Sequence, residues 1–464
     1  MAVLAAEADE VIETSCAVVI LKDGEARKLK KPVDFGFLDF TTVEKRREAL
    51  NRELYFNRRT AEDIYRRVED VAGEPVLVMR RFDHSQVLAE QARSVGWAPD
   101  LSLMEALGAE VARFHAGAER STDPVHMKNT EYVIGSNRKH IESFAAALGP
   151  EAVDAYHLRL EAVYSELEPL VLARFDSGHI RRCHGDLHMG NILIEDHAPV
   201  LFDCIEFNER LMQIDGMYDI GFLLMDLWVR GYRTAANRVL NAYLETAARH
   251  EPEDGLYAGL RLLPLYMSMR AGVRCHVSAH AGDMAQAKVY LEAAHRFLNE
   301  IPAELVCVGG LSGSGKSWHA RKLAPDIGRA TGAVILRSDE VRKRLWQSPS
   351  LERLPPEAYS AEETDRVYGH MLKQADIILS NGHSVILDAT FRDEAYVRDA
   401  STLAYGLGAD FKAIWMDVPA EERLKRVAAR QGDVSDATVE IAARQAEPER
   451  DPTLWTLFRP SDNC

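Results

Sequence analysis

The stretch "CHGDLHMGNILI" contains residue types suited to phosphoryl transfer. Asp186 and Asn191 lie five residues apart in it, and the strand-like run that follows leads to Asp203. Phosphoryl transfer uses an aspartate that accepts or orients a hydroxyl, an asparagine one turn later that ligates Mg²⁺, and a second carboxylate after the next strand. An Asp–Asn pair alone is weak evidence, but His184 and Gly185 stand in the expected order beside it. The spacing therefore predicts a site that binds ATP and magnesium.

A second stretch, "GLSGSGKS", matches the pattern G-x-x-x-x-G-K-[ST] in full, between an expected strand and an expected helix. Glycines there let backbone N–H groups converge on phosphate oxygens, and the helix N-terminus adds a favourable field. Lys316 is expected to reach the β- and γ-phosphates and Ser317 to ligate Mg²⁺. The predicted ATP-binding residues are Gly310, Ser312, Gly313, Ser314, Gly315, Lys316 and Ser317.

Polar residues follow the next two strands of this region. Asp339, in "RSDEVRKRLW", is expected at the carboxyl edge of a sheet, where it can take a proton from an acceptor hydroxyl. Arg342 is expected to hold the acceptor or its negative charge. Asp388 ends the strand in "VILDATF" and is the candidate that completes the Mg²⁺ shell.

Arginines recur at helical spacing in "PAEERLKRVAARQ". Arg423, Arg426 and Arg430 fall on one face of the expected helix. Such a face can clamp ATP phosphates as a lid, and we expect Arg426 and Arg430 to do so. A solvated helix surface explains the same arginines equally well.

These residues need two different scaffolds. A β-rich unit with one helix is expected at about 10–82, and mainly helical patterns run from about 100 to 301, interrupted by short strands around the first motif. After Ile301 and Pro302, strands alternate with helices, which is typical of parallel βαβ units. We therefore predict domains at 1–301 and 302–464.

The first half resembles the aminoglycoside phosphotransferase family, which shares the protein-kinase fold, over about residues 10–300. The matching residues are "CHGDLHMGNILI", "VLFDCIEF" and "YDIGFLLMDL". The resemblance implies that Asp186 is the catalytic base and that Asn191 and Asp203 are metal ligands. The residues that it implies to support the loop are His184, His188, Asp215 and Asp219.

The same resemblance implies that the β-rich unit binds ATP through a lysine held by a helix glutamate. The candidates in "ARKLKKPV" are Lys28 and Lys30 on one face of the strand and Lys31 on the other. We choose Lys30, with Glu53 as its partner and Glu48 as the second choice. The chain lacks a G-x-G-x-x-G loop, and "IETSCAVV" holds that place.

The second half, from about 303 to 464, resembles small P-loop kinases, in particular the group with gluconate kinase, polynucleotide 5′-kinase and zeta-toxin-like enzymes. The matching features are the P-loop, the S-D-x-x-R stretch and the "LDAT" strand end. The resemblance implies ATP-dependent phosphorylation of a hydroxyl, without naming the acceptor.

The net charge, the cysteines and the lengths of the apolar runs indicate which partners and which location to expect. The formal net charge is −16, which opposes nonspecific binding to nucleic acid or anionic membranes. The six cysteines form no C-x-x-C pair and are expected to be reduced thiols. No apolar run reaches the roughly 18 residues that a membrane span needs, and the N-terminus does not read as a signal peptide. We therefore expect a cytoplasmic protein.

Together these patterns predict a multidomain α+β and α/β chain. A two-lobed protein-kinase-like domain is followed by a P-loop three-layer α/β/α domain with a mostly parallel sheet. The predicted function is transfer of the ATP γ-phosphate, with Mg²⁺, to a hydroxyl of a small molecule such as a sugar or an aminoglycoside-like compound. Two alternatives are a nucleic-acid 5′-end kinase in the C-terminal half and a nucleotide-sensing regulator in which one module controls the other.

Overall fold

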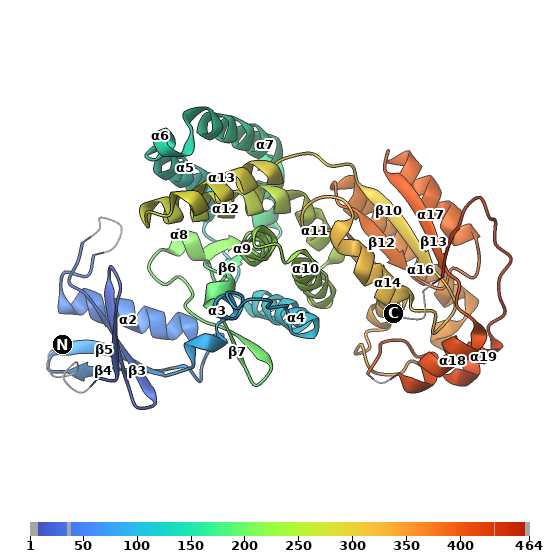
Figure 1. Cartoon of the computed structure of the whole chain (residues 1–464), viewed down its shortest axis with the longest axis horizontal. Coiled ribbons are helices and arrows are strands. Elements are labelled where there is room, and N and C mark those ends of the chain that lie inside the picture. The colour runs from blue at the N-terminus through green and yellow to red at the C-terminus, as the bar shows by residue number, and fades with distance from the viewer. Residues whose placement is uncertain (1–7, 35–38, 431, 460–464) are drawn as a thin grey trace.

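The computed structural model describes residues 8–34, 39–430 and 432–459. Figure 1 shows three parts in chain order: a β-rich N-lobe, a helical lobe in the middle and a P-loop domain at the opposite end. No helix in the described ranges is long and apolar enough to cross a membrane. The described cysteines Cys16, Cys183, Cys204, Cys275 and Cys307 are free, and Cys464 lies outside the described residues.

The N-lobe is an antiparallel sheet, in the order β1-β2-β3-β5-β4, covered by one helix. Its elements are β1 (Glu10–Glu13), β2 (Ala17–Lys22), β3 (Glu25–Lys30), α2 (Val43–Asn57), β4 (Tyr65–Val71) and β5 (Glu74–Arg80). A tight hairpin joins β2 to β3 through Asp23, whose φ of 52° suits such a turn. Lys28 and Lys30 share one face of β3, as predicted, and both reach Glu53 on α2.

The helical lobe packs around α9, which is buried on all sides from Gly216 to Leu227. The α-helices are α3 (Leu88–Gln91), α4 (Leu101–Gly117), α5 (Asn129–Glu142), α6 (Ala145–Leu148), α7 (Pro150–Asp176), α8 (Glu209–Met212), α9 (Gly216–Val229), α10 (Arg233–Ala247), α11 (Glu253–Ala258), α12 (Leu263–His280) and α13 (Met284–Phe297). Two short antiparallel pairs interrupt them: β6 (Ile180–Arg182) with β9 (Gln213–Asp215), and β7 (Ile192–Glu195) with β8 (Ala198–Leu201). These pairs frame the loop that carries Asp186.

The P-loop domain contains a five-stranded sheet in the order β11-β12-β10-β13-β14, and every strand pair is parallel. The strands are β10 (Glu304–Gly309), β11 (Val334–Arg337), β12 (Val385–Asp388), β13 (Asp410–Met416) and β14 (Thr456–Phe458). The helices are α14 (Lys316–Leu323), α15 (Ser338–Leu345), α16 (Ala361–Ser380), α17 (Ala395–Gly406), α18 (Ala420–Ala429) and α19 (Val439–Arg444).

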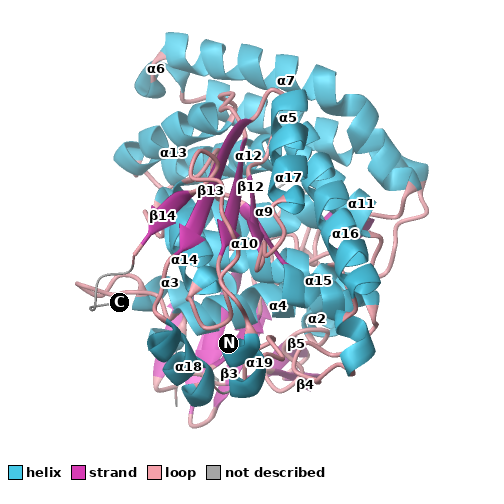
Figure 2. Ribbon diagram, turned by 90° about the vertical axis from the view of Figure 1, so that its right-hand side faces the viewer, coloured by secondary structure: helices cyan, strands magenta, loops and turns pink. Residues whose placement is uncertain are grey.

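Helices cover both faces of this sheet, which gives the predicted three layers (Figure 2). Alternate residues of β10 serve the two faces, as strand geometry requires. Val306 and Val308 pack in one buried cluster with Ala320 of α14, while Leu305 and Cys307 belong to the cluster that contains the buried residues of α16 and α17. That second cluster continues into the helical lobe. The two domains therefore share a continuous core.

The connection between the domains lies between the end of α13 and the start of β10. The predicted boundary after Ile301 falls inside this connection. We propose it as the division into domains 1–301 and 302–464, although the packing across it is extensive.

Candidate active sites

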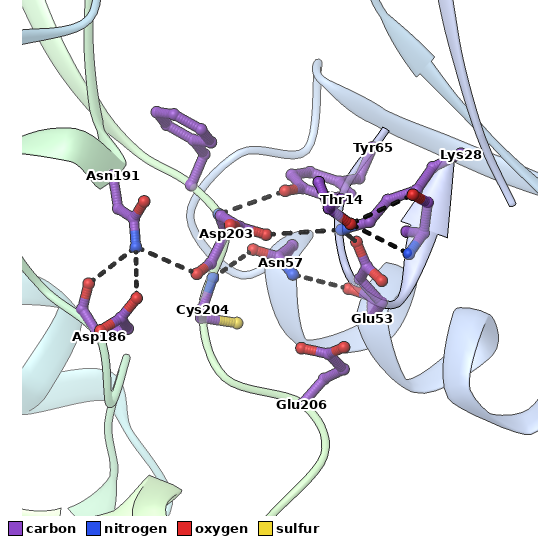
Figure 3. A network of polar contacts seen from close by, with 12 residues as sticks. Thr14, Lys28, Glu53, Asn57, Tyr65, Asp186, Asn191, Asp203, Cys204 and Glu206 are labelled. Atoms are coloured by element: carbon purple, nitrogen blue, oxygen red, sulfur yellow. Dashed lines mark hydrogen bonds and ion pairs between the residues drawn. The ribbon is translucent and has the colours of Figure 1, made fainter. Parts of the chain in front are cut away.

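Asp186, Asn191 and Asp203 lie close together in the helical lobe (Figure 3). Asn191 ends the short 3-10 helix η3 (Met189–Asn191), and the β7–β8 hairpin then leads to Asp203. The Nδ2 atom of Asn191 donates to the Oδ2 atom and to the backbone carbonyl of Asp186, both at 2.9 Å. It also lies 3.5 Å from the backbone carbonyl of Asp203. The three residues that the first motif singled out therefore lie in one site.

Asp203 has a backbone conformation that is rare for a residue other than glycine. Its φ is 59°, and its side chain is 51% exposed. The Tyr65 hydroxyl accepts a hydrogen bond from the N–H of Asp203 at 3.2 Å, and Asn57 accepts one from the N–H of Cys204 at 2.8 Å. Both anchors come from the N-lobe, so the lobes together hold Asp203 in place. Strained residues of this kind concentrate at functional sites.

Asp219, in the first turn of α9, supports the loop that carries Asp186. Its carboxylate is fully buried and accepts hydrogen bonds from the N–H groups of His184 and Gly185, both at 2.9 Å. Nε2 of His115 lies 3.1 Å from the same carboxylate. Burial would raise the pKa of Asp219, but His115 and His184 outweigh it and lower the pKa to about 2.

Asp215 forms a second buried ion pair beneath the loop. Nη2 of Arg174 lies 2.9 Å from its Oδ1, and both side chains are at most 5% exposed. This geometry fits the supporting role that the resemblance implied for Asp215 and Asp219.

The environment of Asp186 keeps it ionised. Burial opposes the charge, but a hydrogen bond from His188 and the charges of His188, His184 and Arg270 lower the pKa of Asp186 to about 2. The Nε2 atom of His188 lies 3.5 Å from Oδ2 of Asp186, and its Nδ1 accepts from the N–H of Gly190 at 2.9 Å. His188 therefore shapes the loop and also touches the candidate base.

Two lysines, not one, converge on Glu53, which is fully buried. Nζ of Lys28 lies 2.5 Å from Oε1 and Nζ of Lys30 lies 2.7 Å from Oε2. Burial would raise the pKa of Glu53, but the two ammonium groups lower it to about 2. Lys28 also lies 3.7 Å from Asp203, whereas Lys30 is 3.0 Å from Glu206, a residue that the sequence patterns did not single out.

The two lysines differ in their access to the cleft. The side chain of Lys28 is 18% exposed and that of Lys30 is 4% exposed. Lys28, next to Asp203, is therefore placed better than Lys30 to contact a nucleotide. The other two candidates lie elsewhere: Lys31 pairs with Glu13 at the surface, and Glu48 is exposed on α2.

The P-loop wraps the N-terminus of α14 with the glycine conformations that the motif requires. Gly313 and Gly315 have φ values of 83° and 85°. A Cβ atom at Gly313 would lie 2.3 Å from the carbonyl oxygen of Arg423, so the close approach also demands glycine. Lys316 folds back, and its Nζ donates to the carbonyl of Leu311 at 3.2 Å. Burial is the main cause that lowers the pKa of Lys316.

A cavity of about 1430 Å³ opens in front of the P-loop. Of the predicted residues, it is lined by Ser312, Gly313, Gly315, Lys316, Ser317, Asp339, Arg342, Asp388 and Arg430. Asp388 is 4% exposed, and its Oδ2 is 3.6 Å from Nε of Arg337. The hydroxyl of Ser317 and the carboxylate of Asp388 are oxygen donors of the type that Mg²⁺ prefers.

Arg342 is more constrained than the sequence suggested. Its guanidinium donates to the carbonyl of Ala358, lies 3.5 Å from Oγ1 of Thr364 and stacks on the ring of Tyr359, 4.9 Å from the centroid. The residue is 6% exposed. Arg342 therefore lines the cavity with much of its hydrogen-bond donor capacity already used by the protein.

The three arginines of the α18 region have separate positions. Arg423 is buried, with Nη1 3.4 Å from the carbonyl of Ser312, and so supports the P-loop from within the protein. Arg426 pairs with Glu422 on its own helix, and Arg430 lines the cavity and pairs with Asp433 at 3.3 Å. A clamp on phosphates stays a prediction for Arg426 and Arg430.

Comparison with known families follows the same division of the chain. The family described as "Phosphotransferase enzyme family" matches residues 59–263, and the family described as "AAA domain" matches residues 305–448. A relative from Mycobacterium tuberculosis (strain ATCC 25618 / H37Rv), called "Uncharacterized protein Rv2004c", is 32% identical over 466 residues. The alignment covers 95% of this chain and 90% of the relative. The chain belongs to the family of this mycobacterial protein. A relative from Mycobacterium bovis, "Uncharacterized protein Mb2027c", gives the same identity and coverage.

Three solved structures have partial likeness to this chain. An ethanolamine kinase of Plasmodium vivax is 13% identical and has a TM-score of 0.38, covering 61% of this chain and 81% of that chain. A GDP complex of aminoglycoside 2′-phosphotransferase-IIIa is 16% identical with a TM-score of 0.36, covering 63% and 93%. The APS kinase CysC of Mycobacterium tuberculosis is 23% identical with a TM-score of 0.25, covering 34% and 88%.

The chain thus consists of an aminoglycoside phosphotransferase-like, protein-kinase-like domain followed by a P-loop domain of the kinase type. Three contributors to the first site carried no recognisable signal in the sequence: Tyr65, Asn57 and Glu206. Each acts through a contact between segments that are distant in the chain, so local spacing could not have revealed them.

Proposed function

We propose that both domains transfer the γ-phosphate of ATP to a hydroxyl of a small molecule. The observation that carries this proposal is the convergence in each domain of a phosphate-binding cation with acidic side chains. In the first site these are Lys28, Asp186 and Asp203. In the second they are Lys316 and Asp339, both on the wall of one cavity.

In the first site, Asp186 is the group that orients the acceptor hydroxyl and receives its proton. Its low pKa keeps it ionised, and Asn191 fixes its orientation. Lys28, held by Glu53, is the cation that contacts the phosphates. Asn191 and Asp203 would hold Mg²⁺, which neutralises phosphate charge when bound. Such a site works mainly through positioning and charge neutralisation.

In the second site, the backbone N–H groups of the P-loop and Lys316 hold the phosphates. Ser317 and Asp388 would hold Mg²⁺, and Asp339 is the base for the acceptor hydroxyl. The cavity extends from the P-loop to Arg342 and Tyr368, which leaves room for ATP and a small acceptor.

The charge of this cavity favours a small polar acceptor over nucleic acid. Acidic and basic side chains line it in equal numbers, and the whole chain is strongly acidic. A nucleic-acid end kinase needs a groove in which basic residues dominate, because phosphate contacts supply most of the affinity. The free thiols support a cytoplasmic location, where ATP is abundant.

The test is a metabolite-extract screen with labelled ATP on the wild type, Asp186→Ala and Lys316→Ala. We expect each substitution to abolish a different set of labelled products, which assigns an acceptor to each domain. If label transfer is the same in all three proteins, the proposed function is wrong.

A further inference from the structure

Helix α10 of the helical lobe covers the open edge of the P-loop sheet. β11 is an edge strand, and an edge strand presents unpaired backbone groups. Nδ2 of Asn237 donates to the carbonyls of Thr331 and Ala333 at 2.7 and 3.0 Å. Oδ1 of Asn241 accepts from the N–H of Ile335 at 2.7 Å. Two side-chain amides of the first domain thus bind backbone groups of β11 and of the residues just before it.

A residue just beyond the C-terminal end of α10 forms a hydrogen bond with α15, the helix that carries Asp339. Arg249 lies just beyond α10 and donates to Oε2 of Glu340 at 2.9 Å and to Oγ of Ser350 at 2.7 Å. Glu340 is 2% exposed and directly follows Asp339 in the first turn of α15. The candidate base of the P-loop site is therefore anchored through its neighbour to the other domain.

Glu245 of α10 completes this contact. It lines the same cavity as Asp339 and Glu340, and interaction with the Glu340 carboxylate is one of the causes that raise its pKa. Burial and the charge of Glu340 raise the pKa of Glu245 to about 8, so Glu245 carries a proton at neutral pH and can offer it to the neighbouring carboxylate. The other charged or titratable groups around the pair, from α10, α11, β11 and α15, are Arg249, Tyr257, Arg337 and Arg344.

The first domain also forms part of the cavity wall itself. Glu105 of α4 and Arg238 and Glu245 of α10 line the same cavity as Lys316 and Asp339. Nη1 of Arg238 lies 2.6 Å from Oε1 of Glu105, which fixes this wall beside the P-loop helix. Figure 1 shows α10 on the side of the helical lobe that faces α14 and the sheet.

We propose that the P-loop active site is a joint site of both domains, in which Glu245 is a positioning residue that orients Asp339 through Glu340. Arg238 and Glu105 close the wall of the cavity. The proposal rests on the proposed phosphotransferase function of the P-loop domain. It goes beyond that function because it makes the first domain a structural part of the second active site.

The test uses the full chain with Asp186→Ala, so that only the P-loop site turns over ATP. Turnover that depends on Lys316 is measured in Glu245→Leu, which cannot donate, and in Glu245→Gln, which can. We expect Glu245→Leu to lower kcat at least tenfold with KM for ATP changed by less than about threefold, because Asp339 moves while the P-loop does not. Glu245→Gln should retain kcat within about threefold. Glu421→Gln, which replaces an exposed carboxyl group on α18, is the control for a glutamate substitution away from the contact between the domains.

The outcomes separate the two proposals. If Lys316-dependent turnover exists and Glu245→Leu leaves kcat unchanged, or if Leu and Gln reduce it equally, the joint site is wrong. If the parent shows no turnover that Lys316→Ala removes, the proposed function fails. Amide hydrogen exchange of residues 338–345 then decides the positioning claim: faster exchange in Glu245→Leu than in Glu245→Gln supports it, and equal exchange overturns it.

Discussion

Replacement of Lys28 by methionine tests which lysine of the first site contacts the nucleotide. Lys28 and Lys30 both pair with Glu53, but Lys28 alone lies beside Asp203 and is the more exposed of the two. The charges of Glu53 and Asp203 overcome the burial of Lys28 and raise its pKa well above the usual value, so it is charged at neutral pH. In Lys28→Met, Glu53 keeps Lys30 as a partner at 2.7 Å, and we expect the fold to survive.

The expected rise in Kd for the nucleotide follows from the hydrogen bond that Lys28→Met removes. A hydrogen bond to a charged group contributes about 1.5–3 kcal/mol, which corresponds to a roughly 10- to 100-fold rise in Kd. Lys30→Met should instead act on stability, because Glu53 keeps Lys28 as a partner but Glu206 loses the ammonium that lies 3.0 Å away. Removal of one partner of a buried ion pair typically costs about 3–5 kcal/mol.

The assay is titration of a fluorescent ATP analogue with Mg²⁺, in a chain that also carries Lys316→Ala so that the P-loop site is silent. Arg27→Met is the matched control, since Arg27 lies on the same strand and loses the same charge but pairs with Glu25 at the surface. Thermal unfolding of each variant separates affinity from stability. If Lys28→Met binds as tightly as its parent while Lys30→Met loses binding, Lys30 is the nucleotide-binding lysine and the geometric reasoning is wrong.

Further substitutions test the strain, the buried ion pair and the protonated carboxyl. Asp203→Gly should raise the unfolding free energy by about 1 kcal/mol, because glycine adopts a φ of 59° without strain. The same substitution should abolish magnesium-dependent nucleotide binding. A less stable variant would contradict the strain at Asp203, and a variant that still binds would contradict its role as a metal ligand. Arg174→Met leaves Asp215 buried without its partner, so denaturant unfolding should show a loss of about 3–5 kcal/mol, and a loss below about 1 kcal/mol would mean that the pair is dispensable. The pKa of Glu245 is raised from 4.5 to about 8, so the stability that its proton contributes is full below the unfolded pKa and disappears as pH rises through the folded one. The Tm of the wild type should accordingly fall more steeply with rising pH across this window than that of Glu245→Gln, and parallel curves would contradict the assignment.

The parts of the chain that the sequence predicted well are those whose chemistry is local. The P-loop and the Asp186–Asn191–Asp203 set each lie within one short segment, where spacing and turn residues determine the geometry. The parallel strands of the second domain follow from the alternation of strand and helix patterns in the same way. The sequence did not predict strands β1 and β4, which are short or rich in charged residues.

The difference between Lys28 and Lys30 could not be predicted from the spacing of residues along the chain. Strand alternation placed both on one face, and this is confirmed. Their difference depends on Asp203 and Glu206, which arrive from the other lobe more than 170 residues away in sequence. Arg342 and Arg423 illustrate the same limit, because their partners Ala358 and Ser312 depend on tertiary packing.

The contacts of α10 make the two domains of this chain structurally dependent on each other. A cut after residue 301 would separate two patterns that are complete as sequence motifs. It would also expose the edge of β11, remove the amides that satisfy Thr331, Ala333 and Ile335, and leave Glu340 without Arg249. α9, which binds the loop of Asp186 through Asp219, is followed after a short turn by α10, which contacts the second candidate site. Each candidate site is therefore supported by the same pair of consecutive helices. If an isolated half loses activity, we expect the loss to reflect a disrupted site before it reflects any signal between domains.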